Sequence, residues 1–226
     1  MGKNVYPANA QEWLKRNAPM TERARYIAHR LVDNGFTAFF AGGCVRDMVM
    51  DRVPEDIDIA TNARPEGVEG LFPKTVPVGV SFGVMKVILD KQDFEVATFR
   101  TEGPYLDGRH PSAVDYASPE EDAHRRDFTV NGMFYDPLKD EIIDFVEGRA
   151  DIDNRIVRTI GDPVDRFEED KLRLLRAVRF AAKLEFEIDE DTWEALCRLA
   201  TKVTQTSWER IRDEIVKILL DRHRRR

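Results

Sequence analysis

The sequence predicts an α+β protein, with a head of mixed strands and helices over residues 1–155 and an all-helical segment over residues 156–226. Two observations predict this fold class. In the first part, short apolar runs alternate with glycine, proline and polar turn residues, which is typical of short strands and helices. Beyond Asp162, apolar residues recur at helical spacing, which indicates helices packed on helices. The chain of 226 residues has room for one large domain or two modest ones.

The first elements of the head alternate between helix and strand. Residues 21–34 carry apolar side chains at helical spacing and predict a helix. Residues 37–41 predict a short buried strand that leads to Gly42 and Gly43. Residues 45–50 predict a short helix whose N-terminus faces this glycine turn, an arrangement that favours anions.

The sequence of the middle of the head predicts one helix and three strands. Residues 57–60 form an apolar run typical of a strand, and residues 65–71 begin with proline, as short helices often do. Residues 84–89 and 94–99 predict two strands joined by the polar turn 90–93, which is typical of a hairpin.

A long loop separates the hairpin from the C-terminal helices. Residues 101–112 contain two glycines and two prolines, and a loop of this length is typical of a functional segment. Residues 113–116 predict one more strand. Residues 164–183, 190–200 and 207–220 then predict three helices.

Composition excludes several classes of protein. No apolar run approaches the roughly 18 residues that span a bilayer. Cys44 and Cys197 lie far apart in the chain, so we expect no disulfide framework and a cytoplasmic location. The net charge of −7 argues against a general nucleic-acid binder, although residues 202–226 hold eight Lys and Arg against four acids. This basic end is either a surface for a polyanion or a solvated tail. Nothing indicates an oligomeric state.

The pair Asp56 and Asp58 is the strongest chemical signal. In a strand, residues two apart point to the same face, so both carboxylates would project together while Ile57 turns into the core. Two carboxylates on one strand suit Mg²⁺, and the upstream glycine pair lets backbone approach a bulky anion. By itself, such a dipeptide pattern is more often a solvated loop end.

Glu95 is a candidate for a third acid. In the predicted strand 94–99 it shares a face with Ala97 and Phe99, so we expect a carboxylate on an otherwise apolar face. A buried carboxylate is costly unless it is paired or bound to a metal. The alternative is an edge strand with Glu95 in water.

Two further clusters are suited to nucleotide binding. Residues 124–131 contain Arg126, Asp127 and Asn131; arginine binds phosphate oxygens through two hydrogen bonds, while Asp and Asn suit ribose hydroxyls. Residues 169–179 predict an amphipathic helix. Its apolar side would comprise Leu174, Leu175, Val178, Ala181 and Ala182.

On the opposite side of that helix, Asp170 and Arg173 would be neighbours. The ordinary interpretation is a solvent-facing ion pair. The alternative is an acceptor and a donor that together match the polar edge of a base.

These motifs together resemble a known family, the class II tRNA nucleotidyltransferases. This family comprises CCA-adding enzymes, is closely related to bacterial poly(A) polymerases, and belongs to the DNA polymerase β superfamily. The resemblance runs in order from about residue 22 to residue 215. It rests on Gly42-Gly43-x-Val45-Arg46-Asp47, Asp56-x-Asp58, Arg125-Arg126-Asp127-Phe128-Thr129-x-Asn131 and Glu169-Asp170-x-x-Arg173-x-x-Arg176-Ala177-x-Arg179-Phe180.

The resemblance implies a polymerase-β-type nucleotidyltransferase head with a small mixed or antiparallel sheet, followed by a helical neck. Catalysis and the binding of two Mg²⁺ ions would fall to Asp56, Asp58 and Glu95. The RNA 3′-hydroxyl of a tRNA would attack the α-phosphate of CTP or ATP. Nucleotide binding would involve Gly42, Gly43, Arg46, Asp47, Arg126, Asp127, Asn131, Asp170, Arg173 and Arg176.

Within this set, the resemblance implies that Asp170 and Arg173 pair with the base in place of a nucleic-acid template. Tyr105, Asp107 and Arg109 would belong to the flexible loop that helps to switch specificity from C to A. The presence of this loop favours the addition of CCA, or of A alone, over the addition of CC.

Two departures from the family pattern bear on function. Residues 78–83 lack the glycine followed by two basic residues that is usual in the poly(A) polymerases, which argues against polyadenylation. The chain also ends in the predicted neck, so we expect a truncation before the body and tail that hold tRNA. The alternatives are an A-adding enzyme, a poly(A) polymerase, or a non-catalytic nucleotide-binding or RNA-binding module.

Overall fold

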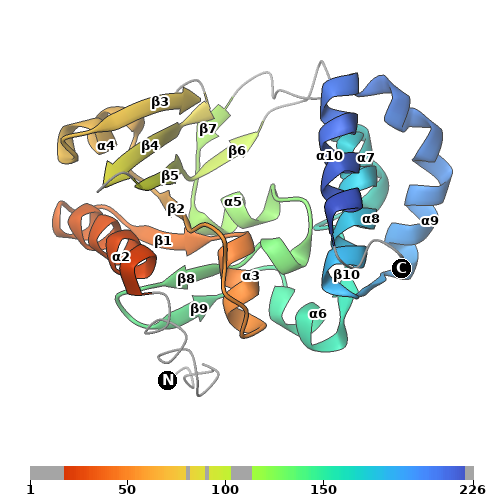
Figure 1. The fold of residues 1–226 in the computed structure, drawn as a ribbon, viewed down its shortest axis with the longest axis horizontal. Coiled ribbons are helices and arrows are strands. Elements are labelled where there is room, and N and C mark those ends of the chain that lie inside the picture. Colours follow the sequence, from red (N-terminus) through yellow and green to blue (C-terminus); the bar gives the residue numbers. More distant parts are fainter. Residues whose placement is uncertain (1–17, 80–81, 90–91, 103–113, 222–226) are drawn as a thin grey trace.

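A mixed seven-stranded sheet forms the centre of the head (Figure 1). The structure is a computed structural model that describes residues 18–79, 82–89, 92–102 and 114–221. Neighbouring strands are antiparallel except for β2 and β5, which are parallel. In sheet order the strands are β3 (Thr75–Gly79), β4 (Val84–Leu89), β5 (Gln92–Thr98), β2 (Asp58–Thr61), β1 (Ala38–Ala41), β8 (Phe134–Asp136) and β9 (Glu141–Ile143).

The two faces of the sheet pack differently because side chains alternate along each strand. Helices α2 (Ala18–Asp33) and α4 (Pro65–Leu71) help to bury one face, where Phe40 and Ile59 are at most 1% exposed. A smaller apolar cluster lies on the other face. It contains the edge-to-face pair Phe99 and Phe134 and includes Ala123 of α5 (Pro119–His124).

Shorter elements connect the sheet to the C-terminal helices. They are α3 (Gly43–Val49), the 3₁₀ turn η2 (Thr129–Asn131), α6 (Gly148–Asn154), the antiparallel pair β6 (Arg100–Glu102) and β7 (Val114–Tyr116), and the parallel pair β10 (Ile156–Val157) and β11 (Glu187–Ile188). The helical part comprises α7 (Pro163–Glu169), α8 (Leu172–Leu184), α9 (Glu190–Leu199), η3 (Ala200–Gln205) and α10 (Trp208–Leu220) (Figure 1). Within the described ranges, no helix has both the length and the apolarity that crossing a membrane requires.

The predicted α+β fold is confirmed, and several elements match closely. The predicted helix 65–71 and strand 84–89 have the same bounds as α4 and β4. Strands β3, β6, β8, β9, β10 and β11 and helices α5 and α6 were not predicted, and residues 101 and 102 of the predicted loop belong to β6. The division of the chain near residue 155 stays a prediction.

The single helix predicted over residues 164–183 is wrong. Asp170 has an extended backbone (φ −140°, ψ 105°) and separates α7 from α8. Its Oδ1 accepts a hydrogen bond from the backbone N–H of Leu172 at 3.0 Å, a local bond that competes with continuous helix. The apolar stripe also differs, because Val178 is 40% exposed. The buried side of α8 is formed instead by Leu172, Arg173, Leu174, Ala177, Phe180 and Leu184.

Candidate active site

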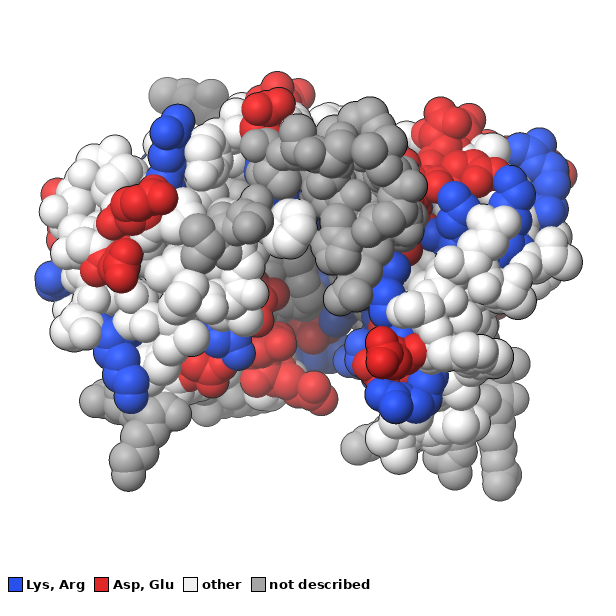
Figure 2. Space-filling view, turned by 90° about the horizontal axis from the view of Figure 1, so that it is seen from above, with Lys and Arg blue, Asp and Glu red and all other residues white. Residues whose placement is uncertain are grey.

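A cavity of about 1030 Å³ lies between the head and the helical part. Figure 2 shows a hollow between the two lobes, with acidic side chains on the head side and Lys and Arg on the helical side. The cavity brings together twelve of the residues that the sequence predicted for the site: Gly42, Gly43, Arg46, Asp47, Asp56, Asp58, Arg126, Asp127, Asn131, Asp170, Arg173 and Arg176. Glu95 does not line it, and Tyr105, Asp107 and Arg109 lie outside the described residues.

The glycine turn before α3 forms one wall of this cavity. Gly42 has a φ of 74°, a region that side chains other than glycine rarely adopt, and an added Cβ would lie 3.1 Å from Nη1 of Arg126. An added Cβ at Gly43 would make only ordinary contacts, the nearest at 3.6 Å. The backbone conformation therefore requires glycine at position 42, whereas at position 43 the approach of a ligand remains the predicted reason.

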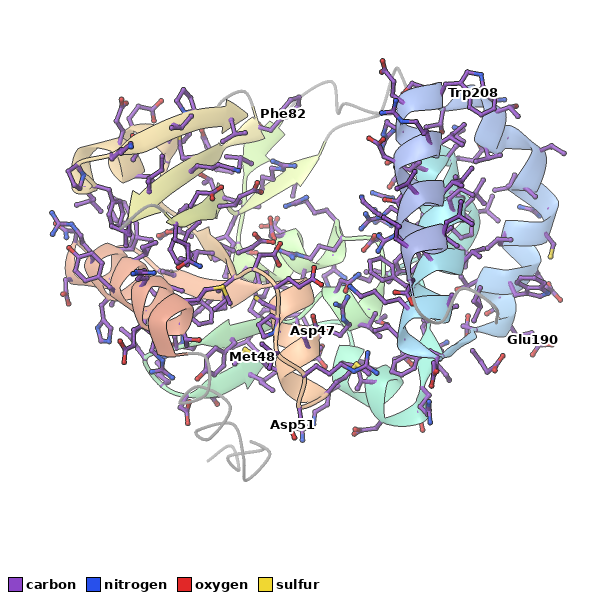
Figure 3. The ribbon with its side chains drawn as sticks, viewed as in Figure 1. Asp47, Met48, Asp51, Phe82, Glu190 and Trp208 are labelled. Carbon is purple, nitrogen blue, oxygen red and sulfur yellow. The ribbon has the colours of Figure 1, made fainter. Side chains whose placement is uncertain are left out.

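Arg46 is buried at the centre of a hydrogen-bond chain. Its Nε and Nη2 donate to Oδ1 of Asp47 at 2.8 and 2.7 Å, and its Nη1 donates to Oδ1 of Asn131 at 2.7 Å. Asn131 donates in turn to Asp127 at 3.5 Å. Asp47 lies on α3, which stands between the central sheet and the helices α8 and α10 (Figure 3).

Asp127 connects this series of hydrogen bonds to the helical part. Arg176 of α8 donates to its Oδ2 from Nε at 2.7 Å and from Nη2 at 2.5 Å. Burial alone would raise the pKa of Asp127, but the charge of Arg176 and its hydrogen bonds hold this pKa below its ordinary value. Asp127 therefore stays ionised, and it fixes an arginine at the cavity wall.

Asp122 is a site residue that the sequence analysis missed. It is 1% exposed and accepts hydrogen bonds from Arg125 at 2.9 Å and from Arg126 at 2.9 Å. Both arginines line the cavity and lie three and four residues after Asp122, so helical spacing was the signal that could have found it. Arg126 also lies over the ring of Phe134, 4.9 Å from its centroid.

Asp58 and Glu95 lie side by side on one face of the sheet. The parallel register pairs Ile59 with Val96, so the residues that precede them are neighbours on the opposite face. Burial raises the pKa of Asp58 to about 7, with further contributions from the negative charges of Asp56 and Glu95, although its side chain remains open to the cavity. The region therefore concentrates negative charge that a cation would relieve.

Two expectations about these acids are wrong. Asp56 is not part of a strand, because β2 begins at Asp58. Glu95 is not buried: its side chain is 51% exposed and lies opposite Lys86, with 4.0 Å between Nζ and Oε1. The residues of β5 that face the core are Phe94, Val96 and Thr98. Among the described residues, no three His, Cys, Asp or Glu side chains form a ready-made metal cluster.

Asp170 and Arg173 both reach the cavity, but they do not pair with each other's side chains. Nη1 of Arg173 donates to Glu169 at 2.6 Å and to the carbonyl of Arg166 at 3.1 Å. Asp170 instead accepts two hydrogen bonds from Arg210 of α10. Arg210 lies 40 residues away in the chain, and no sequence pattern connected it to Asp170.

Comparison with known proteins gives the family. A sequence profile described as "Poly A polymerase head domain" matches residues 38–158, which is more than half of the chain. The chain belongs to this poly A polymerase head-domain family. A second profile, described as "Probable RNA and SrmB- binding site of polymerase A", matches residues 185–226.

Individual members of this family are similar along most of the chain. This chain is 43% identical over 199 residues to a CCA-adding enzyme of Staphylococcus aureus, and the match covers 88% of this chain and 50% of that protein. The crystal structure of the Bacillus stearothermophilus CCA-adding enzyme in complex with CTP matches with a TM-score of 0.83 and 40% identity, covering 91% of this chain and 50% of the other.

A more distant relative is a tRNA nucleotidyltransferase complexed with a primer tRNA and an incoming ATP analogue. It matches with a TM-score of 0.72 and 26% identity, covering 87% of this chain and 57% of that one. The chain therefore spans about half the length of the curated relatives that it matches.

Proposed function

We propose that this chain carries the nucleotide-selecting and catalytic machinery of a tRNA nucleotidyltransferase. The enzyme would add C and A to the 3′ end of tRNA from CTP and ATP, without a nucleic-acid template. One observation supports this most: a single cavity is lined by twelve residues predicted from the motifs of the family. The proposed partners are those bound in the relatives, namely CTP, an ATP analogue and a primer tRNA. We propose the cytoplasm as the location.

The donor set on the head side fits a divalent metal ion, as nucleotidyltransferases generally use. Asp56 and Asp58 line the cavity, and the pKa of Asp58 is raised to about 7 because burial and neighbouring carboxylates disfavour its charge. Mg²⁺ is usually held by one or two carboxylates together with waters and substrate phosphates. We propose two Mg²⁺ ions held by Asp56 and Asp58 with Glu95 beside them; such ions lower the barrier to in-line phosphoryl displacement.

The other residues would bind and orient the nucleotide. Gly42 and Gly43 let backbone approach the triphosphate, and Arg126 and Arg176 present guanidinium groups to phosphate oxygens. The RNA 3′-hydroxyl then forms a bond to the α-phosphorus, and the bond to the leaving pyrophosphate breaks. Arg46 and Asn131 hold Asp47 and Asp127 in place through the hydrogen-bond chain described above.

Base choice would fall to Asp170 and Arg173 on the helical side of the cavity. A carboxylate accepts hydrogen bonds only and a guanidinium donates them only. Together they match a base edge that offers an amino group beside a ring acceptor, which cytosine and adenine both do. Uracil and guanine offer a carbonyl in place of that amino group.

The decisive experiment incubates tRNAs that lack one, two or three 3′ nucleotides with each nucleoside triphosphate and Mg²⁺. Products are resolved at single-nucleotide length. We expect C, C and A to be added in order, and Asp58→Asn to abolish addition. The matched control is Asp93→Asn, an exposed acid that pairs with Lys86 outside the cavity.

The other outcomes assign the alternative functions. Addition of A alone to tRNA ending in C–C indicates an A-adding enzyme, and long adenosine tracts on unstructured RNA indicate a poly(A) polymerase. Nucleotide binding without pyrophosphate release indicates a non-catalytic module. In the same assay, Glu95→Gln tests the third carboxylate: full activity in this variant would remove Glu95 from the metal site.

A further inference from the structure

Arg210 of α10 binds the carboxylate of Asp170 with two parallel hydrogen bonds. Nη1 donates to Oδ1 at 3.1 Å and Nη2 donates to Oδ2 at 2.7 Å. The two side chains are 21% and 14% exposed. This two-point contact fixes the plane of the carboxylate, which a single hydrogen bond would leave free to rotate.

The guanidinium approaches Asp170 from outside the cavity. Asp170 lines the cavity wall, whereas Arg210 does not, although other residues of α10 such as Lys217 and Leu220 do. Arg210 lies two residues after Trp208, which stands at the outer end of α10 (Figure 3). The ion pair therefore holds Asp170 from the side that faces away from the cavity, and the side of Asp170 that lines the cavity stays open to a ligand.

Arg173 is held in the same manner. It lines the cavity, and its partner Glu169, at 2.6 Å, does not. Both proposed base-reading side chains are thus fixed by charged partners outside the cavity. Fixed orientation matters for base selection, because a carboxylate that can rotate can also adapt to the wrong base edge.

Holding α10 against α8 does not depend on Arg210 alone. Asp170 lies between α7 and α8, whereas Arg179 lies within α8, and its ion pair with Glu214 at 2.5 Å joins α8 directly to α10. Arg179 lies over the ring of Phe180, 4.2 Å from its centroid, which adds to this contact. Arg179 and Glu214 can hold the helices together, but they cannot replace the two hydrogen bonds from Arg210 to Asp170.

We propose that Arg210 is a positioning residue for base selection: it orients the Asp170 carboxylate toward the amino group of cytosine or adenine. This inference rests on the proposed function, since it assumes that Asp170 reads the base. Arg210 does not touch the nucleotide, and it acts only through Asp170. Its loss therefore changes which nucleotide binds and leaves the chemistry at the head side unchanged.

The test measures the affinities of CTP, ATP, UTP and GTP by calorimetry, with Mg²⁺ and without RNA, for the wild type and Arg210→Gln. We expect the preference for CTP and ATP over UTP and GTP to fall about tenfold in Arg210→Gln. Arg210→Lys keeps the charge but loses the two-point contact, and it should recover part of the preference. In single-nucleotide addition to tRNA, KM for CTP should rise about tenfold, while kcat stays within about twofold.

Two matched variants separate this role from simple loss of stability. Arg212→Gln removes an exposed arginine of the same helix that pairs with Asp213, and it should behave as the wild type. Glu214→Gln breaks the ion pair that joins α8 to α10, so it should lower the melting temperature without changing base preference. If Glu214→Gln lost base preference to the same extent as Arg210→Gln, the proposed role of Arg210 would be overturned.

A double-mutant cycle with Asp170→Asn completes the test. If Arg210 acts through Asp170, Arg210→Gln has no further effect on base preference in the Asp170→Asn background. The inference would be refuted if Arg210→Gln changed base preference as much in the Asp170→Asn background as in the wild type. It would also be refuted if Arg210→Gln alone left base preference unchanged. Its failure is distinguishable from failure of the proposed function: a wild type that discriminates in binding but extends no tRNA would refute only the latter.

Discussion

Arg176 of α8 donates two hydrogen bonds to one carboxylate oxygen of Asp127, which lies just before the 3₁₀ turn of the head. Asp127 is 10% exposed in this pair and also accepts from the backbone of Phe128 at 2.9 Å. The contact joins the head to the helical part at the cavity wall. The arrangement of the cavity therefore depends on the charged pair of Arg176 and Asp127 as well as on apolar packing.

Replacing Asp127 with Asn should be strongly destabilising. The variant leaves the guanidinium of Arg176, whose side chain is 31% exposed, without its counter-charge. Because this pair is only partly buried, we expect a cost of about 2 kcal/mol, below that of a fully buried pair. We expect this loss in the free energy of unfolding measured by urea denaturation. Asp213→Asn removes an acid from an exposed pair and should cost less than about 0.5 kcal/mol. Equal stability of the two variants would contradict the importance of the Asp127 contact.

Stability should fall in acid because of the same carboxylate. The pKa of Asp127 in the folded protein lies below its ordinary value of 3.8, so near that pH the unfolded chain binds more protons than the folded one. Its stabilising contribution is present above about pH 5 and is lost as the pH falls through the folded pKa. Urea midpoints measured between pH 5 and pH 3 should fall less steeply for Asp127→Asn than for the wild type.

The ionisation of Asp58 affects stability in the opposite direction. Its pKa rises from 3.8 to about 7 on folding, mainly because of burial, so the folded protein loses stability as the pH rises between these values. At pH 8 in EDTA, Asp58→Asn should therefore be more stable than the wild type, by about 1 kcal/mol after discounting for solvent screening.

Added Mg²⁺ should reverse this order, since it stabilises only a protein with intact ligands. Melting temperatures at pH 8, with EDTA and with Mg²⁺, measure both effects. A variant that melts below the wild type in EDTA would show that the Asp58 carboxylate is not strained by its neighbours.

The two glycines before α3 should respond differently to alanine. Gly42→Ala forces a side chain into positive φ and against Arg126, so we expect a loss of about 2 kcal/mol in stability. Gly43→Ala meets only ordinary contacts and should change stability by less than about 0.5 kcal/mol. Its affinity for CTP, measured by calorimetry, should nevertheless fall about tenfold if nucleotide approaches the backbone there. Unchanged CTP affinity would exclude that approach.

Sequence patterns predicted elements whose signals are local. The proline at the start of α4 and the turn residues between β4 and β5 lie within the elements that they define. The patterns failed where long-range contacts decide the structure. Strands β8 and β9 have three residues each, too few for a clear alternation, and they gain their structure by pairing beside β1.

The same distinction applies to the cavity residues. Glu95 was expected to be a buried carboxylate on an apolar face, but it lies opposite Lys86 of the neighbouring strand and its side chain is 51% exposed. Asp170 was expected within a helix, but its side chain bonds to the backbone of Leu172 and to Arg210. Neither outcome could follow from the spacing of residues along one element.

The sequence by itself determined the fold class, the family and twelve of the 22 residues that line the cavity, because residue type and spacing encode local structure and the chemistry of side chains. Tertiary structure alone decided which charged groups hold one another. Asp127 binds Arg176 across 49 residues and Asp170 binds Arg210 across 40. The physical reason is that a side chain's orientation and pKa depend on neighbours in space, and packing of α8 and α10 supplies those neighbours.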